Sequence, residues 1–152
     1  MYNVVYLVEP IDFQLYWKKY KAPEDVPNTD GIYLVMSELD EESQTILDIG
    51  QTIEGGDRLS NHKRRPCWTE SKVLGEPFLR YKFAEMPTSK HSESHRRAAE
   101  CCLRFHVSKK VKLCGEECNK KYGREESVII INSGSYKPLE PEYTCEGVPK
   151  IE

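Results

Sequence analysis

Apolar residues in this 152-residue chain are gathered in short runs that end at proline, glycine or clusters of polar residues. Runs rich in β-branched and aromatic residues, or alternating apolar with polar side chains, predict β-strands. We predict strands at residues 2–8, 32–36, 45–49, 78–86 and 128–131. None of these runs approaches the roughly 20 apolar residues that a helix needs to cross a bilayer, so we expect no membrane partner.

Three segments are predicted to be helices. Residues 92–107 place Ala98, Cys101 and Phe105 on one apolar stripe at helical spacing. Residues 11–21 are predicted to form a short helix, and residues 57–65 a helix that begins at Asp57 and ends before Pro66. The length fits one domain spanning residues 1–152, and the predicted strands and helices give it the α+β class, with a strand and a helix before residue 28 and a strand near the C-terminus.

The charge is strongly segregated along the chain, although the net charge is only −3. Residues 58–124 contain 17 Lys and Arg against 7 Asp and Glu, a balance of +10. The rest of the chain carries 5 basic and 18 acidic residues, a balance of −13. Such segregation bears on partners rather than on the fold, and it keeps nucleic acid open as a partner despite the acidic total.

Six cysteines raise the question of disulfides or metal. The first residues lack a basic stretch and a small-residue cleavage site, so we expect a soluble cytoplasmic protein in which a disulfide framework is not favoured. The main expectation is free thiols. The alternative is a zinc site drawn from Cys101, Cys102, Cys114, Cys118 and His106.

The side chains best suited to catalysis or ligand binding follow one another in a definite order along the chain. A hairpin over residues 31–50 would bring Tyr33 beside Asp48, in the tripeptides Gly-Ile-Tyr and Asp-Ile-Gly. Arg58 and His62 are four residues apart, so a helix would place them on one face. Glu100 lies next to the apolar stripe of the later helix.

This set resembles the GIY-YIG nuclease family over about residues 29–119. Arg58 follows Asp48 by ten residues, as the family arginine follows the second motif, and residues 58–62 match the family's R-L-x-x-H. Glu93 and Glu100 reproduce the E-S-x5-E spacing of the family's metal-binding helix. The resemblance implies a core of a three-stranded antiparallel sheet and helices at about residues 29–119. Residues 1–28 would then be an N-terminal extension, and residues 120–152 a C-terminal strand with an acidic tail.

The resemblance also implies an endonuclease that hydrolyses DNA phosphodiester bonds with one Mg²⁺ or Mn²⁺ held by Glu100. Arg58 would neutralise the phosphate in the transition state. Tyr33 would position or deprotonate the attacking water, and His62 would accept or relay a proton. Asp48 stands where the family has its second tyrosine. It therefore either replaces that tyrosine as a base or marks a non-catalytic module that binds nucleic acid or a protein partner.

Basic and amide side chains around this set are expected to contact phosphates and to make binding salt-sensitive. No specificity domain is evident. The substrate is therefore expected to be selected by its structure, as in branched or damaged DNA, or with the help of a protein partner. The expected nucleic-acid-binding residues are Lys63, Arg64, Arg65, Arg96, Arg97 and Asn119.

Overall fold

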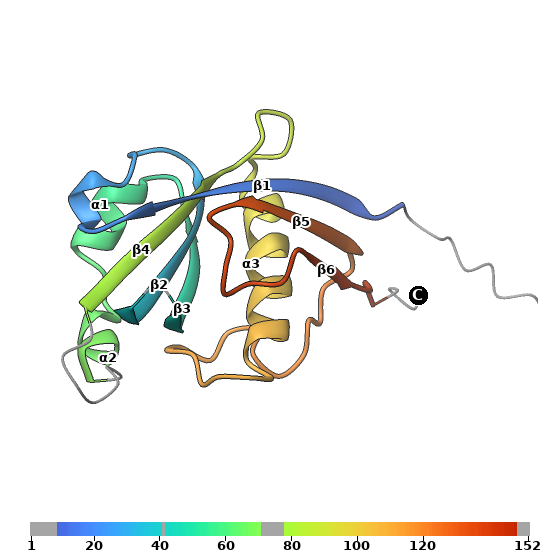
Figure 1. Cartoon of the computed structure of the whole chain (residues 1–152). Coiled ribbons are helices and arrows are strands. Elements are labelled where there is room, and N and C mark those ends of the chain that lie inside the picture. Colours follow the sequence, from blue (N-terminus) through green and yellow to red (C-terminus); the bar gives the residue numbers. More distant parts are fainter. Residues whose placement is uncertain (1–8, 41, 71–77, 149–152) are drawn as a thin grey trace, which may run out of the picture.

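The computed structural model describes residues 9–40, 42–70 and 78–148. In these residues one six-stranded sheet has the order β3-β2-β4-β1-β5-β6 (Figure 1). Neighbouring strands are antiparallel, except that β1 and β5 are parallel. The strands are β1 (Ile11–Tyr20), β2 (Gly31–Asp40), β3 (Ser43–Thr52), β4 (Phe78–Glu85), β5 (Val128–Gly134) and β6 (Glu142–Cys145). The α+β class is confirmed, with a larger and mixed sheet in place of a small antiparallel one.

Different helices cover the two faces of the sheet. Side chains alternate along each strand, so successive residues of β2 face different helices. Helix α3 (Glu93–Val107) packs with Ile32, Leu34 and Met36 of β2 in one apolar cluster. Tyr33 and Val35 belong to a second cluster, with residues of α1 (Gly55–Ser60) and α2 (Arg65–Glu70). Figure 1 shows α1 and α2 at the end of the sheet away from β5 and β6.

The predicted amphipathic helix at residues 92–107 is confirmed as α3. Its first turn is capped by Ser92, whose Oγ accepts a hydrogen bond of 3.2 Å from the His95 backbone N–H. The predicted strands at residues 32–36, 45–49, 78–86 and 128–131 are also confirmed, as β2, β3, β4 and β5. The strand predicted at residues 2–8 lies outside the described residues.

The helix predicted at residues 11–21 is wrong, because this segment forms β1. Phe13, Leu15 and Trp17 are buried at every second position, while Gln14 and Tyr16 between them are exposed. This period of two is the pattern of a strand with one buried face. Strand β1 lies between β4 and β5, in the middle of the sheet.

The single helix predicted at residues 57–65 is wrong in its bounds. Helix α1 ends at Ser60, and Pro66 lies in the first turn of α2 instead of terminating a helix. Proline is well tolerated there because the first backbone N–H groups of a helix have no intrahelical acceptor. Asp57 lies in the first turn of α1 and exchanges hydrogen bonds with Asn28.

The C-terminal segment adds β6 to the sheet beside the predicted strand β5. Trp17 Nε1–H donates a buried hydrogen bond of 2.8 Å to Asn132 Oδ1, which ties β1 to β5. The amide of Asn132 in turn donates to the Glu140 carbonyl at 2.9 Å, next to β6. Residues 128–145 therefore complete the core.

All six cysteines are paired in disulfides, contrary to the expectation of free thiols. The pairs are Cys67–Cys114, Cys101–Cys118 and Cys102–Cys145. The disulfide framework that the sequence did not favour is therefore present, and it links α2, α3, β6 and the loop after α3. Among the described residues, no helix has the length and apolar character required to span a membrane.

A fragment of residues 29–119 is expected not to fold by itself. It lacks β1 and β5, which supply buried Phe13, Leu15, Val128 and Ile130 to the cluster beneath α3. Thermal unfolding followed by circular dichroism should show a cooperative transition for the full chain and none for the fragment. A cooperative transition of the fragment near the melting temperature of the full chain would contradict this.

Candidate functional site

Tyr33 and His62 form a buried pair at the centre of the candidate site. Tyr33 lies on β2 opposite Gly50 of β3 and is 1% exposed. Its Oη lies 2.5 Å from Nε2 of His62, in the turn after α1. A Cβ at position 50 would overlap the Tyr33 hydroxyl, so glycine is required at this close approach.

The hydrogen bonds of His62 define its tautomer. Nδ1 accepts a hydrogen bond of 3.0 Å from the Arg64 backbone N–H, so the proton of the neutral ring is on Nε2. Burial, with Arg64 and Arg58 adding to it, lowers the pKa of His62 to about 4. Neutral His62 therefore donates to Tyr33 Oη, and the phenolic proton of Tyr33 is left to donate elsewhere.

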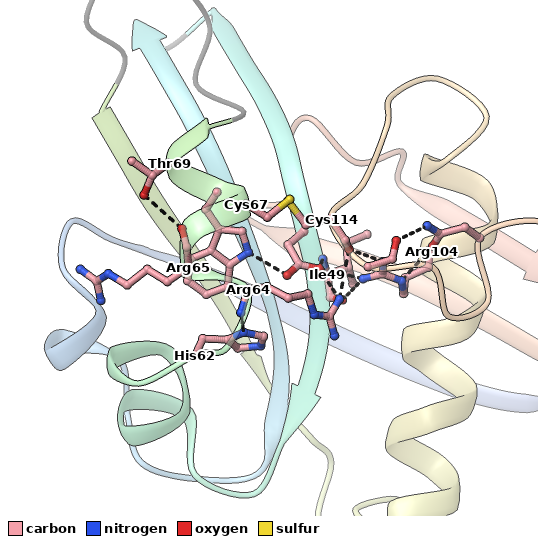
Figure 2. The surroundings of a disulfide bond; sticks show 12 residues. Ile49, His62, Arg64, Arg65, Cys67, Thr69, Arg104 and Cys114 are labelled. Atoms are coloured by element: carbon pink, nitrogen blue, oxygen red, sulfur yellow. Dashed lines mark hydrogen bonds and ion pairs between the residues drawn. A yellow bond between two sulfur atoms is a disulfide. The ribbon is translucent and has the colours of Figure 1, made fainter.

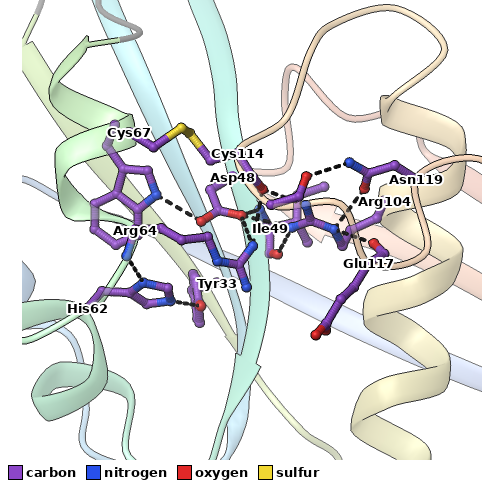
Figure 3. Close-up of polar contacts among 12 residues, drawn as sticks. Tyr33, Asp48, Ile49, His62, Arg64, Cys67, Arg104, Cys114, Glu117 and Asn119 are labelled. Atoms are coloured by element: carbon purple, nitrogen blue, oxygen red, sulfur yellow. Dashed lines mark hydrogen bonds and ion pairs between the residues drawn. A yellow bond between two sulfur atoms is a disulfide. The ribbon is translucent and has the colours of Figure 1, made fainter.

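Asp48, on β3, has a fully buried carboxylate that accepts hydrogen bonds from four donors (Figure 3). Oδ1 accepts from Arg64 Nη1 at 2.9 Å and from Arg104 Nη1 at 2.8 Å. The Ile49 backbone N–H also donates to Oδ1, and Trp68 Nε1–H donates to Oδ2 at 2.8 Å. Both oxygens are thus engaged in internal contacts, which suit a positioning role.

Arg104 extends from α3 to the edge strand β3 and has no exposed surface. Besides Asp48, its guanidinium donates to the Ile49 and Cys114 carbonyls. Its Nε donates to the Glu117 carbonyl at 2.8 Å and to Asn119 Oδ1 at 2.9 Å. One arginine therefore joins α3, β3 and the loop that follows α3.

The Cys67–Cys114 disulfide links α2 to this same loop (Figure 2). The Cys114 carbonyl accepts from Arg64 Nη1 at 3.1 Å as well as from Arg104. The Cys114 backbone N–H donates to the Leu47 carbonyl at 2.7 Å, so the loop also pairs with the edge of β3. Both arginines are consequently held between a covalent link and the sheet.

Glu100, on α3, has the most unusual environment of the candidate site residues. It is 7% exposed, and its carboxylate has no hydrogen-bond or ion-pair partner among the described residues. Burial raises the pKa of the Glu100 carboxyl to about 7, although the positive charges of Arg104 and Arg64 act in the opposite direction. The Glu100 oxygens are not among the fully buried side-chain atoms that lack a partner, so solvent reaches them and they are available to a cation.

The charged candidate residues act electrostatically on the Tyr33 phenol. Burial raises the pKa of the Tyr33 phenol, and the charges of Asp48 and Glu100 raise it further. The positive charges of Arg64 and Arg58 oppose this increase. Because such effects decline with distance, Tyr33, Asp48, Arg58, His62 and Glu100 lie in one region.

The residues expected to contact phosphates divide into an internal and an exposed group. Arg64 and Asn119 bind within the site, and buried Arg96 donates to Gln51 Oε1 at 2.8 Å. Lys63, Arg65 and Arg97 are exposed. Arg58 on α1 is also exposed, and its side chain has no hydrogen-bond or ion-pair partner in the described part of the chain.

The zinc set expected from sequence is not assembled in the described residues, because Cys101 pairs with Cys118 and Cys114 with Cys67. A different set is present instead. Cys102, His106 and Cys145 each offer one potential metal-ligand atom, and these atoms lie within 4.8 Å of one another. Cys102 and Cys145 are also a disulfide pair.

Sequence reasoning missed Arg104 and Trp68, the two buried residues that complete the surroundings of Asp48. Arg104 follows Glu100 by four residues and adjoins the apolar stripe of α3. A basic residue at that position signals a buried ion pair, but its partner is 56 residues away on β3 and only the fold supplies it.

Replacement of Asp48 is expected to destabilise the protein more than loss of any one of its donors. In Asp48→Asn, one amide N–H group must face an arginine or the Trp68 N–H, and Arg104 loses its buried counter-ion; we expect a cost of about 3–5 kcal/mol. Trp68→Phe removes one hydrogen bond to a charged group and is expected to cost about 2 kcal/mol. Chemical denaturation measures both, and an equal or smaller cost for Asp48→Asn would contradict the positioning role.

Removal of the Glu100 charge is expected to stabilise the metal-free protein at high pH. The pKa of Glu100 rises from 4.5 to about 7 on folding, so the native protein loses stability as the pH increases through this interval. Glu100→Gln should therefore exceed the native protein by on the order of 3 kcal/mol above pH 7 and match it below pH 4.5. Denaturation across this range, in the presence of a chelator, measures the difference. The control is Glu93→Gln, at an exposed position of the same helix. Identical profiles of stability against pH for Glu100→Gln and the native protein would refute the raised pKa of Glu100.

Comparison with known proteins gives no match to a family model, a curated protein or a solved structure. Any assignment of function to this chain therefore depends on the chemistry of its own residues.

Proposed function

We propose that the chain is a metal-dependent endonuclease with a GIY-YIG-type site that hydrolyses DNA phosphodiester bonds. The observation that carries the proposal is Glu100, a nearly buried carboxylate without a partner among the described residues. An unpaired buried carboxylate costs free energy unless a ligand uses it. Groups of this kind are concentrated at functional sites.

The donor set fits one hard divalent cation. Mg²⁺ and Mn²⁺ are commonly held by one or two carboxylates, with waters and substrate phosphate oxygens completing the shell. Glu100 would supply that carboxylate, and its pKa near 7 means that cation binding displaces a proton at neutral pH. Bound there, the cation would supply an acidified water and neutralise phosphate charge.

Three other side chains have the chemistry that phosphodiester hydrolysis requires. Arg58 is an exposed, unpaired guanidinium that can bind a phosphate through two parallel hydrogen bonds. Tyr33 accepts from His62 and keeps its own proton, so it can donate to a water or a phosphate oxygen. Its raised pKa argues for such a positioning role rather than for a phenolate base.

In this proposal Asp48 does not act as a base in place of the family tyrosine. Its carboxylate accepts from Arg64 and Arg104, and these two arginines carry one more positive charge than Asp48 neutralises. That surplus charge favours the ionised form of Glu100 and a polyanionic substrate near it. Asp48 would thus support the site without contact with substrate.

Lys63, Arg65 and Arg97, together with Arg58, are the exposed cations proposed to bind the DNA backbone. Contacts of this kind release counterions, so we expect affinity to fall steeply with salt. No base-reading element is apparent among them, which favours a substrate selected by shape, such as branched or damaged DNA, or by a protein partner.

Cleavage of supercoiled, branched and nicked DNA with Mg²⁺ or Mn²⁺ tests the proposal. Glu100→Gln and Arg58→Ala should each lower the cleavage rate by about a hundredfold or more. Glu100→Gln should also abolish Mn²⁺ binding in calorimetry. Lys18→Ala removes an exposed cation from β1 and is the matched control. Full cleavage by both site variants would overturn the proposed roles.

A non-catalytic module that binds nucleic acid is the second candidate, and the state of Asp48 favours it. The position that holds a tyrosine in the family is here committed to four internal hydrogen bonds. This candidate requires salt-sensitive DNA binding with no cleavage by either cation. Asp48→Tyr cannot distinguish the candidates, because loss of the carboxylate would leave Arg104 buried without a counter-ion.

A further inference from the structure

We propose a second metal site, controlled by redox state, in which Cys102, His106 and Cys145 bind Zn²⁺ when the Cys102–Cys145 disulfide is reduced. Their potential ligand atoms already lie within 4.8 Å of one another. In a tetrahedral zinc site with two thiolates and one imidazole, ligand atoms are roughly 3.5 Å apart. To reach this spacing, the two sulfurs must separate and the side chains must rotate.

Local structure presents the three groups together. Cys102 and His106 are four residues apart on α3, which places them on one face of the helix. Cys145 is the last residue of β6, whose backbone also binds the histidine. The site therefore joins the C-terminal strand to the helix that carries Glu100.

His106 is oriented as metal-binding histidines commonly are. Its Nε2 lies 2.8 Å from the Thr144 carbonyl, which can only accept, so Nε2 carries the proton and the lone pair is on Nδ1. A backbone carbonyl that binds one ring nitrogen fixes the tautomer and increases the basicity of the other. Stacking on Tyr143, with ring centroids 5.0 Å apart, holds the ring further.

Burial and charge suit this ligand set. Cys102 and Cys145 are 0% and 3% exposed, and two thiolates neutralise the charge of Zn²⁺, so the complex adds no net charge to the interior. His106, Tyr143 and Thr144 also line a cavity of about 590 Å³. Of the three proposed ligands, His106 lines that cavity, whereas Cys102 and Cys145 lie behind its wall.

The chemistry balances with a dithiol as reductant. The dithiol transfers two electrons and two protons to the Cys102–Cys145 bond, giving two thiols and a cyclic disulfide. Zn²⁺ then forms bonds to both sulfurs and to His106, and both thiol protons leave to solvent. The other two disulfides have no comparable third ligand among the described residues, so they serve as internal controls.

Cobalt substitution tests the site spectroscopically. The native chain, reduced with a phosphine under anaerobic conditions, should bind one Co²⁺ with a thiolate-to-metal charge-transfer band that Zn²⁺ abolishes; the oxidised chain should show no band. Cys102→Ser/Cys145→Ser should lose the band, Cys101→Ser/Cys118→Ser should keep it, and His106→Ala should weaken binding by about tenfold or more. A persistent band in Cys102→Ser/Cys145→Ser, or none in the reduced native chain, would overturn the proposal.

Alkylation of the reduced native chain tests the same site without any substitution. With Zn²⁺ present, the rates at which Cys102 and Cys145 react with iodoacetamide should fall by about tenfold or more. The rates at the other four cysteines should stay unchanged. Peptide mass spectrometry gives the rate at each position. Protection of a different pair, or of none, would refute the site.

Discussion

The buried carboxylate of Asp48 is the interaction on which the candidate site depends. It lies on the edge strand β3 and accepts from Arg64 beside α2, from Arg104 of α3 and from Trp68 of α2. These donors come from both faces of the sheet. A charge with no exposure is stable in a protein only with such complete pairing, so the carboxylate fixes where each donor lies. This contact ties α3, and with it Glu100, to β3, in addition to the apolar packing of the helix on the sheet.

The same contact explains the electrostatics of the site. Two arginines share one carboxylate, which leaves a positive surplus beside Glu100. Burial still outweighs that surplus and raises the pKa of Glu100 to about 7. The site is therefore a positively charged interior with one unpaired acidic group, an arrangement suited to a cation and a phosphate together. Exposed Arg58 and Glu100 both influence the phenol of Tyr33, which is paired with neutral His62.

Covalent links stabilise the segments that regular structure does not hold. The loop after α3 contains no helix or strand, yet its carbonyls bind both arginines of the site. Cys67–Cys114 attaches it to α2, and Cys101–Cys118 attaches it to α3. Gly115, with φ of +80°, allows the loop to turn against Arg64 and Arg104. Cys102–Cys145 instead attaches the last strand, which lies outside the candidate nuclease site.

The sequence by itself determined the hairpin of β2 and β3, strand β4 and helix α3, because their periodicity and capping are properties of neighbouring residues. It also grouped Tyr33, Arg58, His62 and Glu100 as candidate site residues. Only the tertiary structure decided that residues 11–20 form a central strand, that Arg64 and Arg104 turn inward to Asp48, and how six cysteines pair. The buried ion pair of Arg104 and Asp48 joins residues 56 positions apart, and no local pattern specifies which distant group meets a buried charge.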